Sequence, residues 1–304
     1  MEAVRSAASA LRYYPLIIAK IERSRALANV EEILKASDGI MVARGDLGVE
    51  IPIEQIAMVQ KRLTQKANIA GKPVITATQM LLSMTGNRRP TRAESTDVAN
   101  AILDGTDCVM LSEESAMGRY PLEAITMLSG IAAATEPFLV DSSIHSGLAT
   151  PLGHEEVSIR DIICHSVKGA VEQVCPALII APTKTGVTAR RITRFRLPVW
   201  IAGVSRHERT CQQLQFSYGV HPHYEKEHPD DWQLFARELI EHHELEGDIV
   251  ILTERPSARH PTGNNRMEIL DLRRFETSEP LISKKTLTCQ NPFFLAMRKS
   301  VRKA

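Results

Sequence analysis

The sequence predicts an α/β protein with two domains, and three observations support this fold class. Short apolar runs alternate with helical stretches in the first part of the chain, which is the rhythm of βα units around a buried parallel sheet. Polar residues follow each predicted strand, where sites gather in parallel α/β proteins. Residues 138–156 lack periodicity and predict a linker before a second alternation of strands and helices.

The first domain is predicted over residues 1–137. Its apolar runs predict strands at Leu16–Ile21, Gly39–Val42, Pro73–Ala77 and Cys108–Leu111. The helices between them are predicted at Ile53–Ala70, from its three- and four-residue apolar spacing, at Asp97–Leu103, capped by Ser95 or Thr96, and at Pro121–Ala134. Four βα units are half of an eight-stranded barrel, so these residues alone leave open a doubly wound sheet or part of a barrel.

The second domain is predicted over residues 157–274. Its helices are expected at 157–174, 187–195, 207–214 and 230–243, and its strands at 177–181, 199–204, 248–253 and 266–272. The tail, residues 275–304, is expected to be irregular, with a basic end.

The composition excludes several classes of protein. Hydrophobic residues make up 43% and charged residues 24%, which is typical of a globular protein and not of a disordered or collagen-like one. A net charge of +1 gives no case for nucleic-acid binding, and no apolar run is long enough to span a membrane. The start shows no secretory signal, and the 5 cysteines form no C-x-x-C pair, so we expect a cytoplasmic protein without a zinc site or disulfides.

Lys20 and Glu22 lie two residues apart in the first predicted strand, so their side chains share one face of it. Burying a lysine on such a strand costs free energy, because its ammonium loses solvation, unless a carboxylate pairs with it. The pair therefore predicts either a structural ion pair at the mouth of the strand or a functional lysine, and the pentapeptide alone does not separate the two.

Asp46 follows the second predicted strand and lies between Gly45 and Gly48. Glycine there would allow a turn with positive φ and a close approach of the backbone to an anion. Because Glu22 ends the neighbouring strand, its carboxylate and that of Asp46 are expected to converge and to hold a Mg²⁺ ion. The alternative is an ordinary Gly-Asp turn.

Two further strand ends carry candidate residues. Thr78 offers a hydroxyl to an oxyanion, although Thr76 shares its face and both could simply line the sheet. Glu113 and Glu114 are adjacent after the fourth strand, so one of them is expected to point to solvent. The basic loop Asn87–Glu94 could bind phosphate, but salt bridges at a domain or subunit contact are the preferred interpretation.

One turn of the second domain has the chemistry of a phosphate site. Thr183, Lys184, Thr185 and Gly186 lie between a predicted strand and a predicted helix. Hydroxyls, a lysine and a helix N-terminus could cradle a phosphate, although the Walker A spacing is absent. Helix capping by threonine explains the same residues about as well.

Several long strings occur in the order and at the spacing of one family. They are Ile18–Glu22, Ser37–Glu50, Gly71–Met80, Arg89–Glu94, Asp97–Asn100 and Val109–Ser112, with Asn265–Asp271 near the end. Over about residues 1–274 the chain resembles pyruvate kinase. The resemblance implies the last four βα units of a (βα)8 TIM-type barrel and then the smaller α/β C-terminal regulatory domain, with the N-terminal half barrel and the lid domain absent.

The resemblance also implies an activity, which is transfer of phosphate from phosphoenolpyruvate to ADP, giving pyruvate and ATP in glycolysis. Lys20 resembles the lysine that stabilises the transferring phosphoryl group, and Glu22 and Asp46 resemble the ligands of Mg²⁺ (or Mn²⁺). The groups that bind the substrate carboxylate are resembled by the backbone of Gly45 and Asp46 together with Thr78.

Ser112 and Glu114 resemble a polar network that helps to protonate the enolate, although Glu113 stands where many members have a small residue. Thr183–Gly186 resembles the loop that binds a phosphorylated effector. The family implies K⁺, but its K⁺ site is not expected within these residues, and neither is much of the nucleotide site. A homotetramer is implied by analogy, and no nucleic-acid or membrane partner is indicated.

Two other functions compete with this interpretation. The chain could be a non-catalytic module that binds a phosphorylated effector through its second domain. It could also be another barrel enzyme that handles pyruvate-type substrates with Mg²⁺, such as a lyase, but the phosphate-like turn of the second domain counts against that.

Overall fold

The protein is described by a computed structural model, which covers residues 1–139, 158–254 and 265–273. It divides into two compact units, Met1–Gly147 and Leu148–Ala304. The predicted tail lies outside the described residues, as does the predicted linker beyond its first two residues. No helix in the described ranges is long and apolar enough to cross a membrane.

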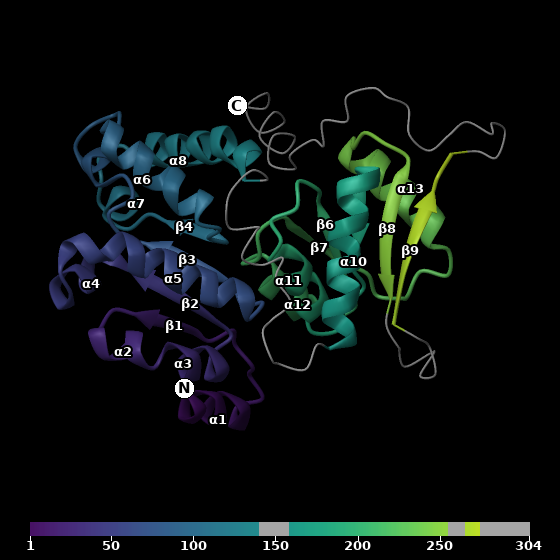
Figure 1. Cartoon of the computed structure of the whole chain (residues 1–304), viewed down its shortest axis with the longest axis horizontal. Helices are drawn as coiled ribbons and strands as arrows, with labels where there is room; N and C mark the ends of the chain where they lie inside the picture. Colours follow the sequence, from purple (N-terminus) through teal and green to yellow (C-terminus); the bar gives the residue numbers. More distant parts are fainter. Residues whose placement is uncertain (140–157, 255–264, 274–304) are drawn as a thin grey trace. The chain divides into compact units, whose positions relative to one another are not determined.

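The first unit is built on a four-stranded sheet in the order β1-β2-β3-β4, with every pair parallel (Figure 1). The strands are β1 (Ile18–Ile21), β2 (Gly39–Ala43), β3 (Val74–Ala77) and β4 (Cys108–Met110). Every residue of β3 is buried, as is typical of a parallel strand that is covered on both faces. The strands predicted from the four apolar runs are confirmed.

Helices precede, connect and follow these strands. They are α1 (Glu2–Ala10), α2 (Ser24–Ala28), α3 (Val30–Ala36), α4 (Arg44–Glu50), α5 (Ile56–Ile69), α6 (Arg92–Leu103), α7 (Glu113–Ala116) and α8 (Pro121–Thr135), with 3-10 turns at Ile53–Gln55, Leu82–Thr85 and Glu136–Phe138. The core forms where α3 and α5 pack on the sheet. Val30 and Leu34 of α3 and Leu63 of α5 lie there with Ile40 and Val42 of β2.

The predicted start of one helix is wrong. Helix α6 begins at Arg92, before Asp97, and its cap is Thr91 and not Ser95 or Thr96. The Thr91 hydroxyl accepts from the Glu94 amide at 3.2 Å, and the Glu94 carboxylate accepts from the Thr91 amide at 2.8 Å. This reciprocal capping box satisfies two helix-end amides, which explains why the helix begins there.

The second unit has a five-stranded sheet in the order β7-β6-β5-β8-β9, in which only the β8–β9 pair is antiparallel. Its strands are β5 (Leu178–Ile180), β6 (Ile201–Ser205), β7 (Val220–Tyr224), β8 (Ile249–Glu254) and β9 (Arg266–Asp271). Strand β7 escaped prediction because His221, Pro222 and His223 interrupt its apolar pattern. A partial barrel followed by a smaller α/β domain is confirmed as the fold class.

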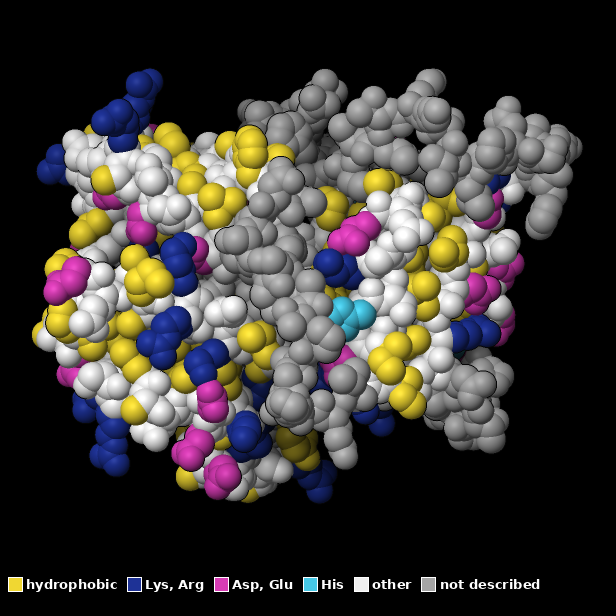
Figure 2. All heavy atoms as spheres, in the orientation of Figure 1, with side chains coloured by type: hydrophobic (Ala, Val, Ile, Leu, Met, Phe, Trp, Pro, Cys, Tyr) yellow, Lys and Arg dark blue, Asp and Glu magenta, His cyan; other side chains and the backbone are white. Residues whose placement is uncertain are grey.

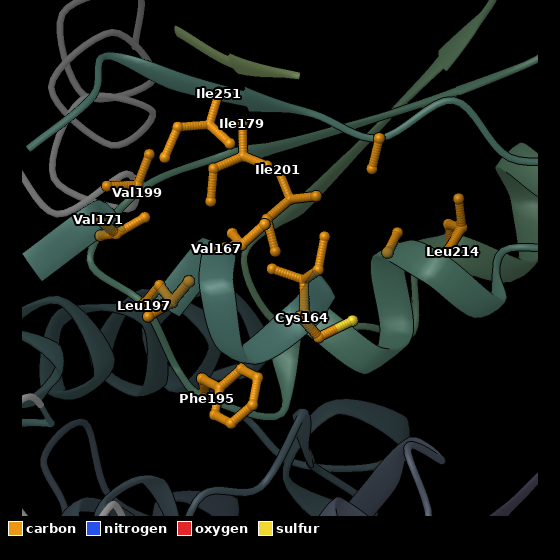
Figure 3. Packing of buried hydrophobic residues seen from close by; sticks show 13 residues of the cluster. Cys164, Val167, Val171, Ile179, Phe195, Leu197, Val199, Ile201, Leu214 and Ile251 are labelled. Atoms are coloured by element: carbon orange, nitrogen blue, oxygen red, sulfur yellow. The ribbon is translucent and has the colours of Figure 1, made fainter. Parts of the chain in front are cut away.

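Helices cover both faces of this second sheet. They are α10 (Ile159–Val174), α11 (Val187–Thr193), α12 (Glu208–Leu214) and α13 (Trp232–His243). On one face Val167 and Val171 of α10 pack with Ile179 and Ile201 of the central strands (Figure 3). On the other face α13 contributes a second apolar cluster, so the parallel strands are buried from both sides.

Candidate active site

Three charged side chains meet at the carboxyl ends of β1 and β2. The Lys20 ammonium nitrogen lies 2.5 Å from Glu22 Oε2 and 2.7 Å from Asp46 Oδ2. The three side chains are 50%, 36% and 54% exposed, respectively, so solvent and ligands can reach them. The structure therefore brings together the three residues that the sequence singled out at the first two strand ends.

The ammonium sets the charge state of this cluster. Its hydrogen bond to Asp46, and then the one to Glu22, raise the pKa of Lys20 above its ordinary value. The same hydrogen bond from Lys20 lowers the pKa of Asp46. Lys20 is therefore protonated and Asp46 ionised around neutral pH, and the carboxylate stays available to a cation in mildly acidic solution.

The chain around Asp46 is helical, which corrects the predicted glycine turn. Helix α4 begins at Arg44, directly after β2, so Asp46 lies in its first turn. Gly45 does not have the positive φ that was expected of it. A Cβ atom at Gly45 would approach the Thr78 hydroxyl at 3.4 Å, so glycine there allows a close approach between α4 and the end of β3.

Thr78 occupies a strained position at the end of β3. Its φ is 68° and that of Gln79 is 54°, so two consecutive non-glycine residues adopt the left-handed conformation. The Thr78 hydroxyl accepts from the Gly45 amide at 2.9 Å and donates to the Ala77 carbonyl at 2.6 Å. Strain of this kind persists only where the surroundings hold it, and it clusters at functional sites.

Arg44 holds this strained turn in place, a role that the sequence analysis did not give it. Its guanidinium is buried and donates to the carbonyls of Thr78 at 2.8 Å and Gln79 at 3.2 Å. It also donates to the Asp97 carboxylate at 2.6 Å. A basic residue after a strand usually points to solvent, so only its place directly before Gly45 and Asp46 could have drawn attention to it.

The end of β4 is held by a buried carboxylate. Glu114 is fully buried, and its two oxygens accept the backbone amides of Ser112 at 2.8 Å and Leu81 at 3.0 Å. Glu113 is exposed, so the expectation that one of the two neighbouring acids points to solvent is confirmed. Glu114 thus ties the loop after β4 to the loop after β3 and orients Ser112.

In the second unit, the turn Thr183–Gly186 is organised by internal hydrogen bonds. The Thr183 hydroxyl accepts from the Gly186 amide at 2.9 Å, and the Lys184 carbonyl accepts from the Thr210 hydroxyl at 2.8 Å. Gly186 has a φ of 80° and precedes α11. The N-cap residue of α11 is Gly186 and no side chain caps the helix, so the prediction of capping by threonine is wrong. The Thr183 bond closes the turn instead, and the phosphate interpretation stays a prediction that rests on the exposed Lys184 side chain.

Comparison with known families accounts for both units. The model for the pyruvate kinase barrel domain matches residues 1–125, and the model for the pyruvate kinase alpha/beta domain matches residues 161–270. The chain belongs to the pyruvate kinase family. The resemblance seen in the sequence is thereby confirmed.

Individual relatives agree with this assignment. The chain is 47% identical over 260 residues to a pyruvate kinase of Thermococcus litoralis, covering 84% of this chain and 54% of the relative. It is 42% identical over 264 residues to one of Geobacillus stearothermophilus, covering 83% of this chain and 43% of the relative. The chain thus spans about half the length of the curated relatives it matches.

A solved structure of the family has the same fold. The crystal structure of a pyruvate kinase from Cryptosporidium parvum matches with a TM-score of 0.75 and 39% sequence identity. The match covers 84% of this chain and 51% of that one.

The donor set of this pyruvate kinase-family site suits a hard divalent cation. The oxygens of Glu22 and Asp46 converge on the same ammonium, so the two carboxylates are close enough to serve one ion. In the described part of the chain, no group of three or more His, Cys, Asp or Glu side chains is arranged to hold a metal. The ion would therefore take its remaining ligands from substrate and water, which is how Mg²⁺ is usually bound.

Proposed function

We propose that this chain binds phosphoenolpyruvate and transfers its phosphoryl group to ADP in the presence of Mg²⁺ (or Mn²⁺) and K⁺, giving pyruvate and ATP. The observation that carries the proposal is the Lys20 ammonium between the carboxylates of Glu22 and Asp46. Phosphoryl transfer depends mainly on positioning and on positive charge near the phosphoryl oxygens, and this cluster supplies both.

Each residue of the cluster has a role in this proposal. Glu22 and Asp46 would hold the divalent ion, which supplies positive charge to the phosphoryl oxygens. Lys20 stabilises the negative charge of the transferring group through its ammonium, whose raised pKa keeps it protonated. The backbone amides of Gly45 and Asp46 and the Thr78 hydroxyl would bind and orient the substrate carboxylate. To do so, the Gly45 amide and the Thr78 hydroxyl would exchange their present hydrogen bonds, to each other at 2.9 Å and to the Ala77 carbonyl at 2.6 Å, for bonds to the carboxylate.

Ser112 is proposed to help deliver the proton that the enolate takes up. Its backbone is held by Glu114, whose carboxylate accepts hydrogen bonds from the amides of Ser112 and Leu81. Glu114 is therefore a positioning residue in this proposal, because both of its oxygens already have partners and it is fully buried.

The partners follow from the same site. We propose phosphoenolpyruvate and ADP as substrates, a homo-oligomeric assembly and a phosphorylated effector at the turn Thr183–Gly186. The alternative function, a non-catalytic effector-binding module, would rest on that turn alone. The hydrogen bonds of this turn close it on itself and join it to Thr210, and none of them points to a ligand, so no observation favours the alternative over the catalytic proposal.

The test is turnover of phosphoenolpyruvate by the purified chain with ADP, Mg²⁺ and K⁺. Lys20→Ala is expected to lower kcat by roughly 10²-fold or more, because it removes a charge that acts on the transferring group. Lys35→Ala, at an exposed position of α3, is the matched control and should leave kcat unchanged. Wild-type turnover that is absent, or that equals that of Lys20→Ala, would contradict the proposal.

A further inference from the structure

Histidines gather at one place in the second unit. Of the 10 histidines in the chain, five fall in the segment 221–243. On the face drawn in Figure 2, charged side chains are common and histidine is scarce among the described residues. Three of the five, His221 on β7 and His242 and His243 in the last turn of α13, form a chain of ring contacts that ends on Trp200, directly before β6. These four residues are called the ring cluster below.

The side chains of the ring cluster pack directly on one another. The His221 ring stacks on the Trp200 indole, with centroids 5.2 Å apart and planes at 29°. The His243 ring meets that of His221 edge-on at 4.6 Å and that of His242 at 4.8 Å, and it lies 5.8 Å from the indole. The cluster therefore joins the carboxyl end of α13 to β7 through titratable rings rather than through aliphatic side chains.

We propose that the ring cluster is an acid-sensitive latch: when its imidazoles take up protons, the last turn of α13 separates from β7 and the Trp200 indole becomes accessible to solvent. The inference concerns the second unit alone and does not depend on the proposed phosphotransferase activity. Imidazole is the side chain whose charge ordinarily changes between about pH 5 and pH 8, and protonation of histidine clusters is a general way of opening packed contacts.

The titratable groups that face His221 are themselves histidines. They are His223 on β7 and His242 and His243 on α13, and each of them gains positive charge on acidification. Glu225 follows β7 and lies 3.7 Å from the His223 ring, so its carboxylate compensates His223 and not His221. Burial lowers the pKa of His221, and the charges of His223 and His242 lower it further.

The other neighbours of His221 bring no negative charge to it. In β6 its register partner is Ala202, and Trp200 covers its ring. Helices α11 and α12 pack against the opposite face of β7, where Val220 joins the core, because successive strand residues point to opposite faces. A proton on His221 therefore meets like charge from the other rings of the cluster and no carboxylate from these neighbours.

The Trp200 indole affects both the closed and the open state. Its face attracts a cation that is stacked on it, which favours a first proton on His221 in the closed state. A second proton, on His243, places two like charges on half-buried rings, where solvent screens their repulsion only in part. The indole Nε1 is buried and has no hydrogen-bond partner among the described residues, so opening gives this N–H access to water.

Linkage gives the direction of the pH dependence. Because the pKa of His221 is lower in the folded unit than its ordinary value of 6.5, the folded unit holds fewer protons than the unfolded chain, and its stability falls as the pH drops below that value. Opening returns the imidazoles to water, so acid favours the open state over the closed one for the same reason. We therefore expect the cluster to be closed at about pH 7.5 and open at about pH 5.5.

The test measures how accessible Trp200 is to acrylamide, a neutral quencher. The full-length chain carries Trp232→Phe, which leaves Trp200 as the remaining one of its 2 tryptophans. The bimolecular quenching constant, obtained from fluorescence lifetimes, is expected to rise about twofold from pH 7.5 to pH 5.5, because protonated rings release the indole. Far-ultraviolet circular dichroism should stay unchanged over the same range, because only the last turn of α13 moves.

Two double variants in the same background remove the protons of the cluster. His221→Phe with His243→Phe keeps both rings, and His221→Gln with His243→Gln keeps polar groups at both positions. Each pair should give the same quenching constant at pH 7.5 and pH 5.5. The control is His228→Gln, at a histidine outside the cluster that pairs with Glu254 at 3.3 Å, and it should keep the twofold rise.

Three results would overturn the proposal. The first is a quenching constant that does not rise at pH 5.5 in the Trp232→Phe protein. The second is a rise that persists in both double variants, which would show that other groups open the site. The third is a loss of the circular dichroism signal at pH 5.5, because the second unit would then unfold rather than open at one contact.

Discussion

Replacing Arg44 by alanine is expected to lower the free energy of unfolding of the first unit by about 3 kcal/mol, because the carbonyls of Thr78 and Gln79 lose their buried donor. Arg44 donates to Asp97 and to the carbonyls of Thr78 and Gln79, and its side chain is only 7% exposed. Without it, two left-handed residues lose the contacts that hold them. Urea unfolding followed by circular dichroism measures the loss.

Two further variants separate the role of Arg44 from a general effect of losing an arginine. Arg62→Ala, at an exposed position of α5, should change stability by less than about 0.5 kcal/mol. Arg44→Lys should recover only part of the loss, because an ammonium cannot reproduce the planar guanidinium contacts. An Arg44→Ala protein as stable as the wild type would show that the turn at Thr78 is held by other contacts.

Replacing Glu136 by glutamine is expected to stabilise the first unit at alkaline pH, by a free energy on the order of 3 kcal/mol. Glu136 is 4% exposed, and its Oε2 has no hydrogen-bond partner among the described residues. Burial raises the pKa of this carboxyl from 4.5 to about 8. The folded protein therefore prefers the neutral form, which glutamine imitates.

The direction of the pH dependence follows from linkage. Between about pH 4.5 and pH 8 the folded state keeps a proton on Glu136 that the unfolded chain releases, so stability falls as the pH rises through this range. Urea unfolding at pH 5 and pH 9 should show this fall in the wild type and a smaller one in Glu136→Gln. Glu123→Gln, at a partly exposed carboxyl of α8, is the control. Equal pH dependence in wild type and Glu136→Gln would refute the assignment.

Much of the fold could be predicted because the hydrophobic pattern of each strand is local in the sequence. Each strand of the first unit is a short apolar run that is followed by polar residues, and the two central strands, β2 and β3, are buried along almost their whole length. Strand β7 is different, since its edge position lets His221 and His223 replace apolar residues. Helix α4 was missed because glycines at 45 and 48 have low helix propensity, and tertiary contacts with Thr78 override it.

The candidate site likewise has residues that could be predicted from the sequence and residues that could not. Lys20, Glu22 and Asp46 could be predicted to meet because neighbouring parallel strands place their carboxyl ends side by side. Other features depend on contacts between residues far apart in the chain. They are the left-handed turn at Thr78, the guanidinium of Arg44 that holds it and the two hydrogen bonds that the Glu114 carboxylate accepts. Periodicity and composition contain no information on such contacts.

The most direct test of the central claim is a titration of the chain with Mn²⁺, followed by the electron paramagnetic resonance signal of the free ion. We predict one site per chain, weakened roughly tenfold or more by Glu22→Gln and by Asp46→Asn, because each removes a carboxylate charge from the site. Glu54→Gln, at an exposed carboxylate of the neighbouring 3-10 turn, should bind as the wild type does. Unchanged Mn²⁺ affinity in both site variants would contradict the claim that these two carboxylates hold one divalent ion.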